Sequence, residues 1–168
     1  MFANGRIWIA YLIVFASSAC TLVIELIAGR IMAPYIGVSL YTWTSIIGIV
    51  LAGMSVGNYL GGLVADRAPS RRTLGLIFLA AGIASLGILV VTDLAVAARL
   101  SLSLLPRIVF YTTAIFFLPS LVLGMVSPVV VKLALTDLER TGNTVGTLYA
   151  VSTVGSIVGT FLTGFWLI

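Results

Sequence analysis

Residues 73–92 read TLGLIFLAAGIASLGILVVT, twenty residues in a row without a charged side chain. The hydrocarbon core of a bilayer is about 30 Å thick, so a spanning helix needs roughly 20 predominantly apolar residues. Residues 73–92 meet this length on their own. On either side of this run, four more uncharged runs have about the length that a spanning helix needs: residues 7–24, 31–65, 108–131 and 141–168. The sequence therefore predicts about five membrane-spanning helices.

The composition is typical of a chain that faces lipid. Hydrophobic residues make up 61% of the 168 residues, charged residues make up 8%, and the mean hydropathy is +1.23. A soluble domain carries roughly a quarter charged residues, and a transmembrane barrel shows alternating strands of about ten residues. We therefore expect an all-α, polytopic transmembrane helical bundle in a single domain, residues 1–168, with helices at about 6–33, 40–64, 73–92, 107–135 and 144–168.

Prolines and glycines predict where the helices break. Pro34 and Gly37 are expected to end the first helix. Residues 93–107 form an amphipathic segment that a proline closes, and we expect this segment to lie at the membrane interface. Pro119 and Pro128 fall inside the fourth helix, where neighbouring helices can satisfy the carbonyls that a proline leaves unpaired.

The basic residues favour one orientation in the membrane. With the N-terminus in the cytoplasm, six basic residues fall on the inner side and two on the outer side, as the positive-inside rule requires. The inner set is Arg6, Arg67, Arg71, Arg72, Lys132 and Arg140, and the outer set is Arg99 and Arg107. We expect a bacterial plasma (inner) membrane protein with its N-terminus cytoplasmic and its C-terminus outside. Because these charges flank apolar runs, they indicate topology rather than nucleic-acid binding.

The first predicted helix carries a carboxylate, Glu25, after its apolar run. At helical spacing this residue belongs to one stripe of polar and small residues: Tyr11, Ser18, Thr21, Glu25, Gly29 and Met32. A charged carboxylate near the bilayer centre costs roughly 2.5–3.5 kcal/mol on insertion scales, so such residues are functional by default. Two interpretations stay open: Glu25 binds a substrate or a proton, or it makes a structural pair with Arg30 or an interhelical hydrogen bond. Arg30 lies about 140° away around the helix, which disfavours the pair.

Glycines recur at four-residue spacing on two of the predicted helices. The second helix has Gly53, Gly57 and Gly61, and the fifth has Gly142 with Gly146 and Gly155 with Gly159. Small residues at this spacing let another helix backbone approach closely, so we expect these faces to pack against protein. Asn58 lies beside the first glycine face, where it can hydrogen-bond a partner helix or a substrate.

The loop after the second helix has a more specific pattern, in which Gly62, Asp66 and Arg67 are followed by Arg71 and Arg72. This order resembles the loop signature between helices 2 and 3 of the major facilitator superfamily. The resemblance implies that Asp66 lies at a helix end and pairs with a basic group on a neighbouring helix. The alternative is an ordinary cytoplasmic stop signal, because arginine clusters are expected there.

Five short stretches carry a resemblance to a known family. They are ELIAGRIMAP at residues 25–34, YTWT at 41–44, GNYLGG at 57–62, GMVSP at 124–128 and LYAVSTVGSIVG at 148–159. Together they resemble the membrane portion of spermidine-synthase-like proteins, in which a major-facilitator-like bundle is fused to an aminopropyltransferase-type domain. No pattern of the synthase domain is present, so aminopropyl transfer is not implied. The five helices are expected to form part of one major-facilitator half.

Two functions are compatible with these features, and neither is an enzyme. The first is a transport-type module for a polyamine or another organic cation, acting with a partner or as an oligomer. Glu25 would supply the counter-charge, and Tyr41 and Trp43 would offer cation–π contacts of about 0.5–2 kcal/mol each. The alternative is a non-catalytic membrane subunit that stabilises or assembles a larger complex. With no histidine and one cysteine, the chain is expected to bind no metal and no cofactor.

Overall fold

The computed structural model describes residues 7–97, 102–135 and 141–167, and these residues form helices with short connections. The helices are α1 (Ile7–Ile36), α2 (Leu40–Arg67), α3 (Arg71–Ala97), α4 (Leu104–Gly124), α5 (Val126–Ala134) and α6 (Thr141–Leu162), followed by a π-helical turn, η1 (Thr163–Leu167). Five helical segments are long and apolar enough to cross a membrane, with α4 and α5 forming one of them and α6 and η1 another. The prediction of an all-α bundle with five membrane-spanning helices is confirmed.

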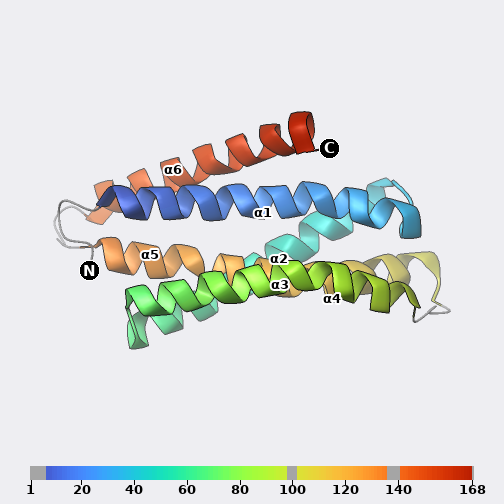
Figure 1. Cartoon of the computed structure of the whole chain (residues 1–168), viewed down its shortest axis with the longest axis horizontal. Coiled ribbons are helices and arrows are strands. Elements are labelled where there is room, and N and C mark those ends of the chain that lie inside the picture. The colour runs from blue at the N-terminus through green and yellow to red at the C-terminus, as the bar shows by residue number, and fades with distance from the viewer. Residues whose placement is uncertain (1–6, 98–101, 136–140, 168) are drawn as a thin grey trace.

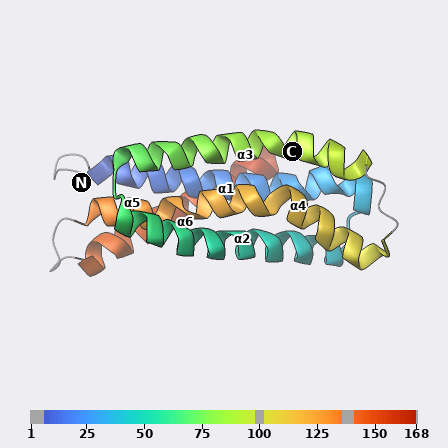
Figure 2. The ribbon, with the colours of Figure 1, turned by 90° about the horizontal axis from the view of Figure 1, so that it is seen from below.

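The helices lie side by side along the long axis of the molecule (Figures 1 and 2). Because successive spans reverse direction, α1 and α6 start at one end of the bundle, and α2 and α4 start at the other (Figure 1). The most extensive contacts join α2 with α4 and α1 with α6, so the two main helix pairs are both parallel. In Figure 2, α4 lies between α3 and α2.

The end of α1 differs from the prediction. The helix continues through Pro34 to Ile36, and Gly37 follows it with a φ of +74°, a left-handed conformation that favours glycine. The Gly37 N–H donates to the Ala33 carbonyl over 3.0 Å. The prediction that Pro34 ends the helix is wrong, because a proline this close to the end removes only one helical hydrogen bond.

The segment at residues 93–107 joins the ends of two helices. α3 extends to Ala97 and α4 begins at Leu104, so these helix ends differ by a few residues from the predicted ones, and residues 98–101 lie outside the described part of the chain. The expected location of the segment at the membrane interface stays a prediction. Pro106 falls in the first turn of α4, where the missing N–H has no helical acceptor to bond. Sequence alone placed the boundary at Asp93, a charged residue that the structure keeps within α3.

The fourth predicted helix is interrupted at Met125, which separates α4 from α5. Pro128 accounts for the break, because it has no N–H to donate to the carbonyl four residues earlier, at Gly124, and its ring crowds that carbonyl. Pro119, in contrast, lies within α4 without ending it. Both prolines lie within one membrane-spanning segment, Leu104–Ala134, as predicted, and the helix is interrupted at Met125.

Glycines of α2 meet the backbone of α4 and of the residues that follow it. A Cβ atom added to Gly53 would lie 2.8 Å from the Phe117 carbonyl oxygen, and one added to Gly61 would lie 2.7 Å from the Met125 Cα. At Gly57, the added atom would overlap the Leu121 carbonyl. Only glycine permits this separation between the two helices.

The second close contact joins α6 to α1. A Cβ added to Gly155 would overlap the Phe15 carbonyl, and one added to Gly159 would lie 2.5 Å from the Ala19 carbonyl oxygen. Gly142 and Gly146 behave differently, since an added Cβ would meet no atom of the structure within 4 Å. Within the described chain this glycine face meets no neighbour, so its packing against protein stays a prediction for another chain.

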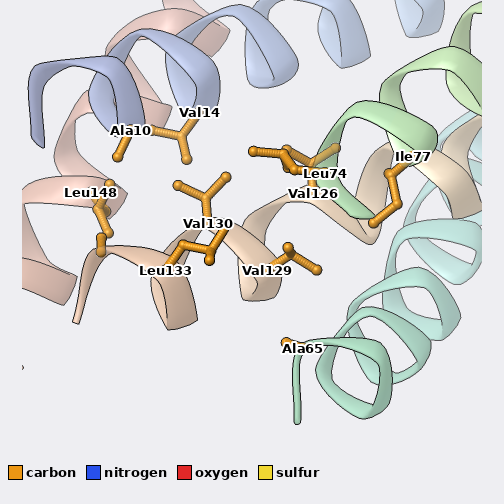
Figure 3. Packing of buried hydrophobic residues seen from close by; sticks show 11 residues of the cluster. Ala10, Val14, Ala65, Leu74, Ile77, Val126, Val129, Val130, Leu133 and Leu148 are labelled. Atoms are coloured by element: carbon orange, nitrogen blue, oxygen red, sulfur yellow. The ribbon is translucent and has the colours of Figure 1, made fainter. Parts of the chain in front are cut away.

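The apolar core around α5 gathers the ends of four other helices. Figure 3 shows Val126, Val129, Val130 and Leu133 of α5 surrounded by Ala10 and Val14 of α1, Leu74 and Ile77 of α3, Leu148 of α6 and Ala65 of α2. A second cluster fills the other half of the bundle around the fully buried Phe116 of α4. The two clusters join both helix pairs into one bundle.

We expect the substitution Gly57→Ala to destabilise the protein by about 1–3 kcal/mol, because the new methyl group must push α4 away from α2. Gly48→Ala on the same helix is the matched control, since its Cβ would meet no neighbouring atom. The measurement is the midpoint of SDS-induced unfolding in mild detergent, followed by circular dichroism. Equal midpoints for the two variants would contradict the close α2–α4 contact.

Candidate functional site

A cavity of about 580 Å³ lies between α1, α2, α6 and the α4–α5 segment. Its polar lining residues come from four different helices and are mostly hydroxyl groups: Ser17, Ser18 and Thr21 of α1, Asn58 and Asp66 of α2, Ser127 and Lys132 of α5, and Tyr149 and Ser152 of α6. Hydroxyl and amide groups can both donate and accept hydrogen bonds. The cavity is therefore an open groove between the helices, with hydroxyl and amide groups from several helices along an otherwise apolar wall.

Two hydrogen bonds order the wall of this cavity on α1. The Ser18 and Ser152 hydroxyl groups lie 2.5 Å apart and connect α1 to α6. The Thr21 hydroxyl donates to the Ser17 carbonyl oxygen, one turn earlier in α1, over 3.0 Å. A hydroxyl bonded within its own helix can be placed in an apolar bundle at little cost. These contacts hold the polar side chains on the face of α1 that lines the cavity.

An ion pair lies at one end of the cavity. The Lys132 Nζ donates to the Asp66 Oδ1 over 2.8 Å, connecting the last turn of α5 to the end of α2. The Asp66 side chain is 72% exposed and that of Lys132 is 48% exposed, so the pair lies at the surface. It joins a helix-end carboxylate to a basic group on a neighbouring helix, the arrangement that the loop signature implied for Asp66.

The other residues of the loop signature surround the turn between α2 and α3. Gly62 lines the polar cavity, and an added Cβ there would meet no atom within 4 Å. Arg67, Arg71 and Arg72 are exposed. Of the residues in the loop signature, Gly62 and Asp66 therefore line the cavity, and the three arginines lie on the surface around the turn.

A second cavity, of about 320 Å³, lies near the opposite end of the bundle. It is lined by Leu26, Gly29, Arg30, Ala33, Val38, Thr42, Trp43 and Gly164. The sequence-predicted site residues are therefore not all together: Ser18, Thr21 and Asn58 line the first cavity, whereas Arg30 and Trp43 line the second. Tyr41 is exposed and lines neither.

Glu25 is half-buried and lies one helical turn beyond Thr21 on α1. It is not among the residues that line either cavity. Within the described part of the chain, its carboxylate forms no ion pair with Arg30, which agrees with their angular separation around the helix. Its neighbours on the predicted stripe, Thr21, Gly29 and Met32, are buried, so this face of α1 turns towards protein.

Sequence reasoning missed several residues of the polar cavity: Ser17, Ser127, Lys132, Tyr149 and Ser152. Lys132 counted only as a topology charge, and Ser127, Tyr149 and Ser152 lay inside quoted stretches without a role of their own. Only the packing of α6 and α5 against α1 brings them together. Among the described residues, no group of three or more His, Cys, Asp and Glu side chains could hold a metal ion.

The chain matches no family model, no curated protein and no solved structure. The resemblance to the membrane portion of spermidine-synthase-like proteins therefore stays a prediction from the sequence.

We expect the Asp66–Lys132 pair to contribute about 0.2–1 kcal/mol to stability, because solvent screens a pair this exposed. A double-mutant cycle of Asp66→Asn and Lys132→Met measures the coupling free energy from unfolding midpoints in detergent. Raising the salt concentration should reduce the coupling. A coupling above about 2 kcal/mol would mean that the pair is shielded from water, in conflict with its position.

Proposed function

We propose that this integral membrane protein is a transport-type module that binds a small polar solute in the 580 Å³ cavity. The observation that carries the proposal is the convergence of polar side chains from α1, α2, α5 and α6 inside the membrane-spanning bundle. Polar groups within a membrane are costly and mark solute or ion pathways. The volume lies within the roughly 300–1,000 Å³ range of small-molecule sites.

In this proposal the chain lies in a bacterial inner membrane with its N-terminus in the cytoplasm and its C-terminus outside. The support is the distribution of basic residues: Arg67, Arg71, Arg72 and Lys132 lie at the end of the bundle where α1 begins (Figure 1). Basic side chains are enriched on the cytoplasmic side. The Asp66–Lys132 end of the cavity then faces the cytoplasm.

The chain would act with a partner or as an oligomer. Asn58 and Tyr149 line the polar cavity from α2 and α6 and are both exposed in the single chain. An exposed amide in the middle of a spanning helix is unfavourable against lipid. A second membrane chain or a water-filled entrance would remove this cost.

The narrower proposal of a polyamine or another organic cation as the solute depends on Glu25. Asp66, the carboxylate in the cavity lining, already pairs with Lys132. A cation therefore needs a further counter-charge, and Glu25 lies one helical turn from Thr21 in the cavity wall. Trp43 and Tyr41 lie near the far end of α1, beyond Glu25 along the bundle.

One observation favours the alternative, a non-catalytic subunit of a larger membrane complex. Gly142 and Gly146 leave an open, smooth strip at the start of α6. A helix of another chain could approach this strip closely, as α1 does at Gly155. Purification in mild detergent separates the two functions. A stoichiometric complex with other membrane chains that the substitution Gly146→Leu dissociates would support the subunit function.

We expect Gly62→Leu to reduce solute uptake at least tenfold, because the leucine side chain extends into the cavity without meeting the backbone. The measurement is uptake of radiolabelled spermidine, serine and xylose into proteoliposomes, as cationic, zwitterionic and neutral probes. Gly48→Leu is the matched control on the same helix, with open space at its Cβ. No uptake of any probe, or equal uptake by both variants, would contradict a transport route through this cavity.

The substitution Glu25→Gln tests the cation proposal separately. Removing the counter-charge should reduce spermidine uptake at least tenfold and leave uptake of neutral xylose within about twofold, since a tenfold effect corresponds to about 1.4 kcal/mol. Circular dichroism checks that the variant remains folded. Unchanged spermidine uptake would exclude Glu25 from solute binding.

A further inference from the structure

The second cavity has a chemical character opposite to that of the polar cavity. Its walls are Leu26, Ala33, Val38 and the glycines of α1 and η1, with the Trp43 ring on one side. The Thr42 hydroxyl in the lining is already bonded to the Gly37 carbonyl oxygen over 3.1 Å. Arg30 is the charged residue of this lining. The cavity thus combines an apolar interior with one guanidinium group.

The wall formed by Trp43 is held in place by close packing. A Cβ added to Gly29 would lie 2.7 Å from the Trp43 Cη2, so the indole ring rests directly on the α1 backbone. Since Arg30 follows Gly29 in the chain, the Trp43 ring of α2 packs against the turn of α1 that carries the Arg30 guanidinium. An amphipathic indole next to an arginine is typical of the membrane interface.

The depth of Arg30 follows from the length of α1. Its 30 residues span about 45 Å at 1.5 Å per residue, against a hydrocarbon core of about 30 Å. If the helix is centred, the core ends about five residues before Ile36, next to Arg30. Leu26 lies one turn deeper, among the acyl chains. With α1 centred in this way, the Arg30 guanidinium would lie near the level of the lipid phosphates, with the apolar wall at Leu26 below it.

We propose that this cavity binds an anionic phospholipid, with one acyl chain against Leu26 and Trp43 and the phosphate at Arg30. An apolar cavity stays dry, so hydrocarbon rather than water is its natural content within a bilayer. Arginine binds phosphate through parallel N–H donors, and with five such donors it can hold a phosphate alongside a contact within the chain. Among the described residues that line the cavity, Arg30 is the one with a charged side chain.

Quenching of Trp43 fluorescence by brominated lipids tests this assignment. Trp8 and Trp166 are 57% and 86% exposed, so Trp8→Phe with Trp166→Phe leaves Trp43 as the single reporter. In phosphatidylcholine vesicles, phosphatidylglycerol with brominated acyl chains should associate with Trp43 about fivefold more strongly than brominated phosphatidylcholine, as expected for one basic side chain. Arg30→Gln should abolish the preference, and Arg30→Lys should keep part of it.

Filling the cavity gives a second, independent result. An added Cβ at Gly164 meets no atom within 4 Å, so Gly164→Leu can occupy the space and should weaken quenching by both lipids. Gly87→Leu on α3 is the matched control, with open space at its Cβ and no part in this lining, and should leave quenching unchanged. Circular dichroism and gel filtration check that each variant is folded.

Several outcomes would overturn the lipid site. They are equal quenching by the two lipids in the parent protein, a preference that survives Arg30→Gln, and full quenching in Gly164→Leu. If Arg30→Gln does not fold, the comparison of Gly164→Leu with Gly87→Leu decides the question alone. Inorganic phosphate at 10 mM should not compete, because it lacks the acyl chain. Competition by phosphate would identify a soluble anion as the ligand and contradict the assignment.

Discussion

The close approach of glycine faces to neighbouring backbones is the constraint on which the rest of this bundle depends. In a bilayer, helices gain no hydrophobic stabilisation from leaving lipid, so their association depends on packing at short range. Gly57 and Gly61 bring α2 against the end of α4, and Gly155 brings α6 against α1. These two parallel pairs make the most extensive helix contacts of the fold. α5 contacts both pairs, and α3 packs mainly against α4.

The polar cavity follows from this arrangement. Gly124, Ser127 and Pro128 at the α4–α5 break all belong to its lining. Because Pro128 removes the hydrogen bond to the Gly124 carbonyl, the break leaves a polar backbone group that lipid could not satisfy. Irregular backbone at membrane depth is tolerated where it is buried in protein or lines a cavity. The cavity beside the helix break therefore gives the unpaired backbone carbonyl a place away from lipid.

The sequence predicted those features that follow from a single helix. Bilayer thickness and uncharged runs determined the five spans, and glycine spacing predicted the packed faces at Gly57 and Gly155. Boundaries were less accurate, since Pro34 stays inside α1 and α3 continues past Asp93. The cavities could not be predicted, because each needs side chains from several helices. Lys132 shows this well: alone it is a topology signal, and only α5 packing beside α2 brings it to Asp66.

Glu25 lies on α1 between the two cavities. Thr21, four residues before it, lines the polar cavity, and Gly29, four residues after it, lines the apolar one, so each lies about 6 Å away along the helix. A charged carboxylate at this depth costs roughly 2.5–3.5 kcal/mol on insertion scales. Within the described chain no ion pair with Glu25 offsets that cost. In the proposed function a cationic solute or a partner chain would offset this cost, which links the proposed transport role to the proposed partner.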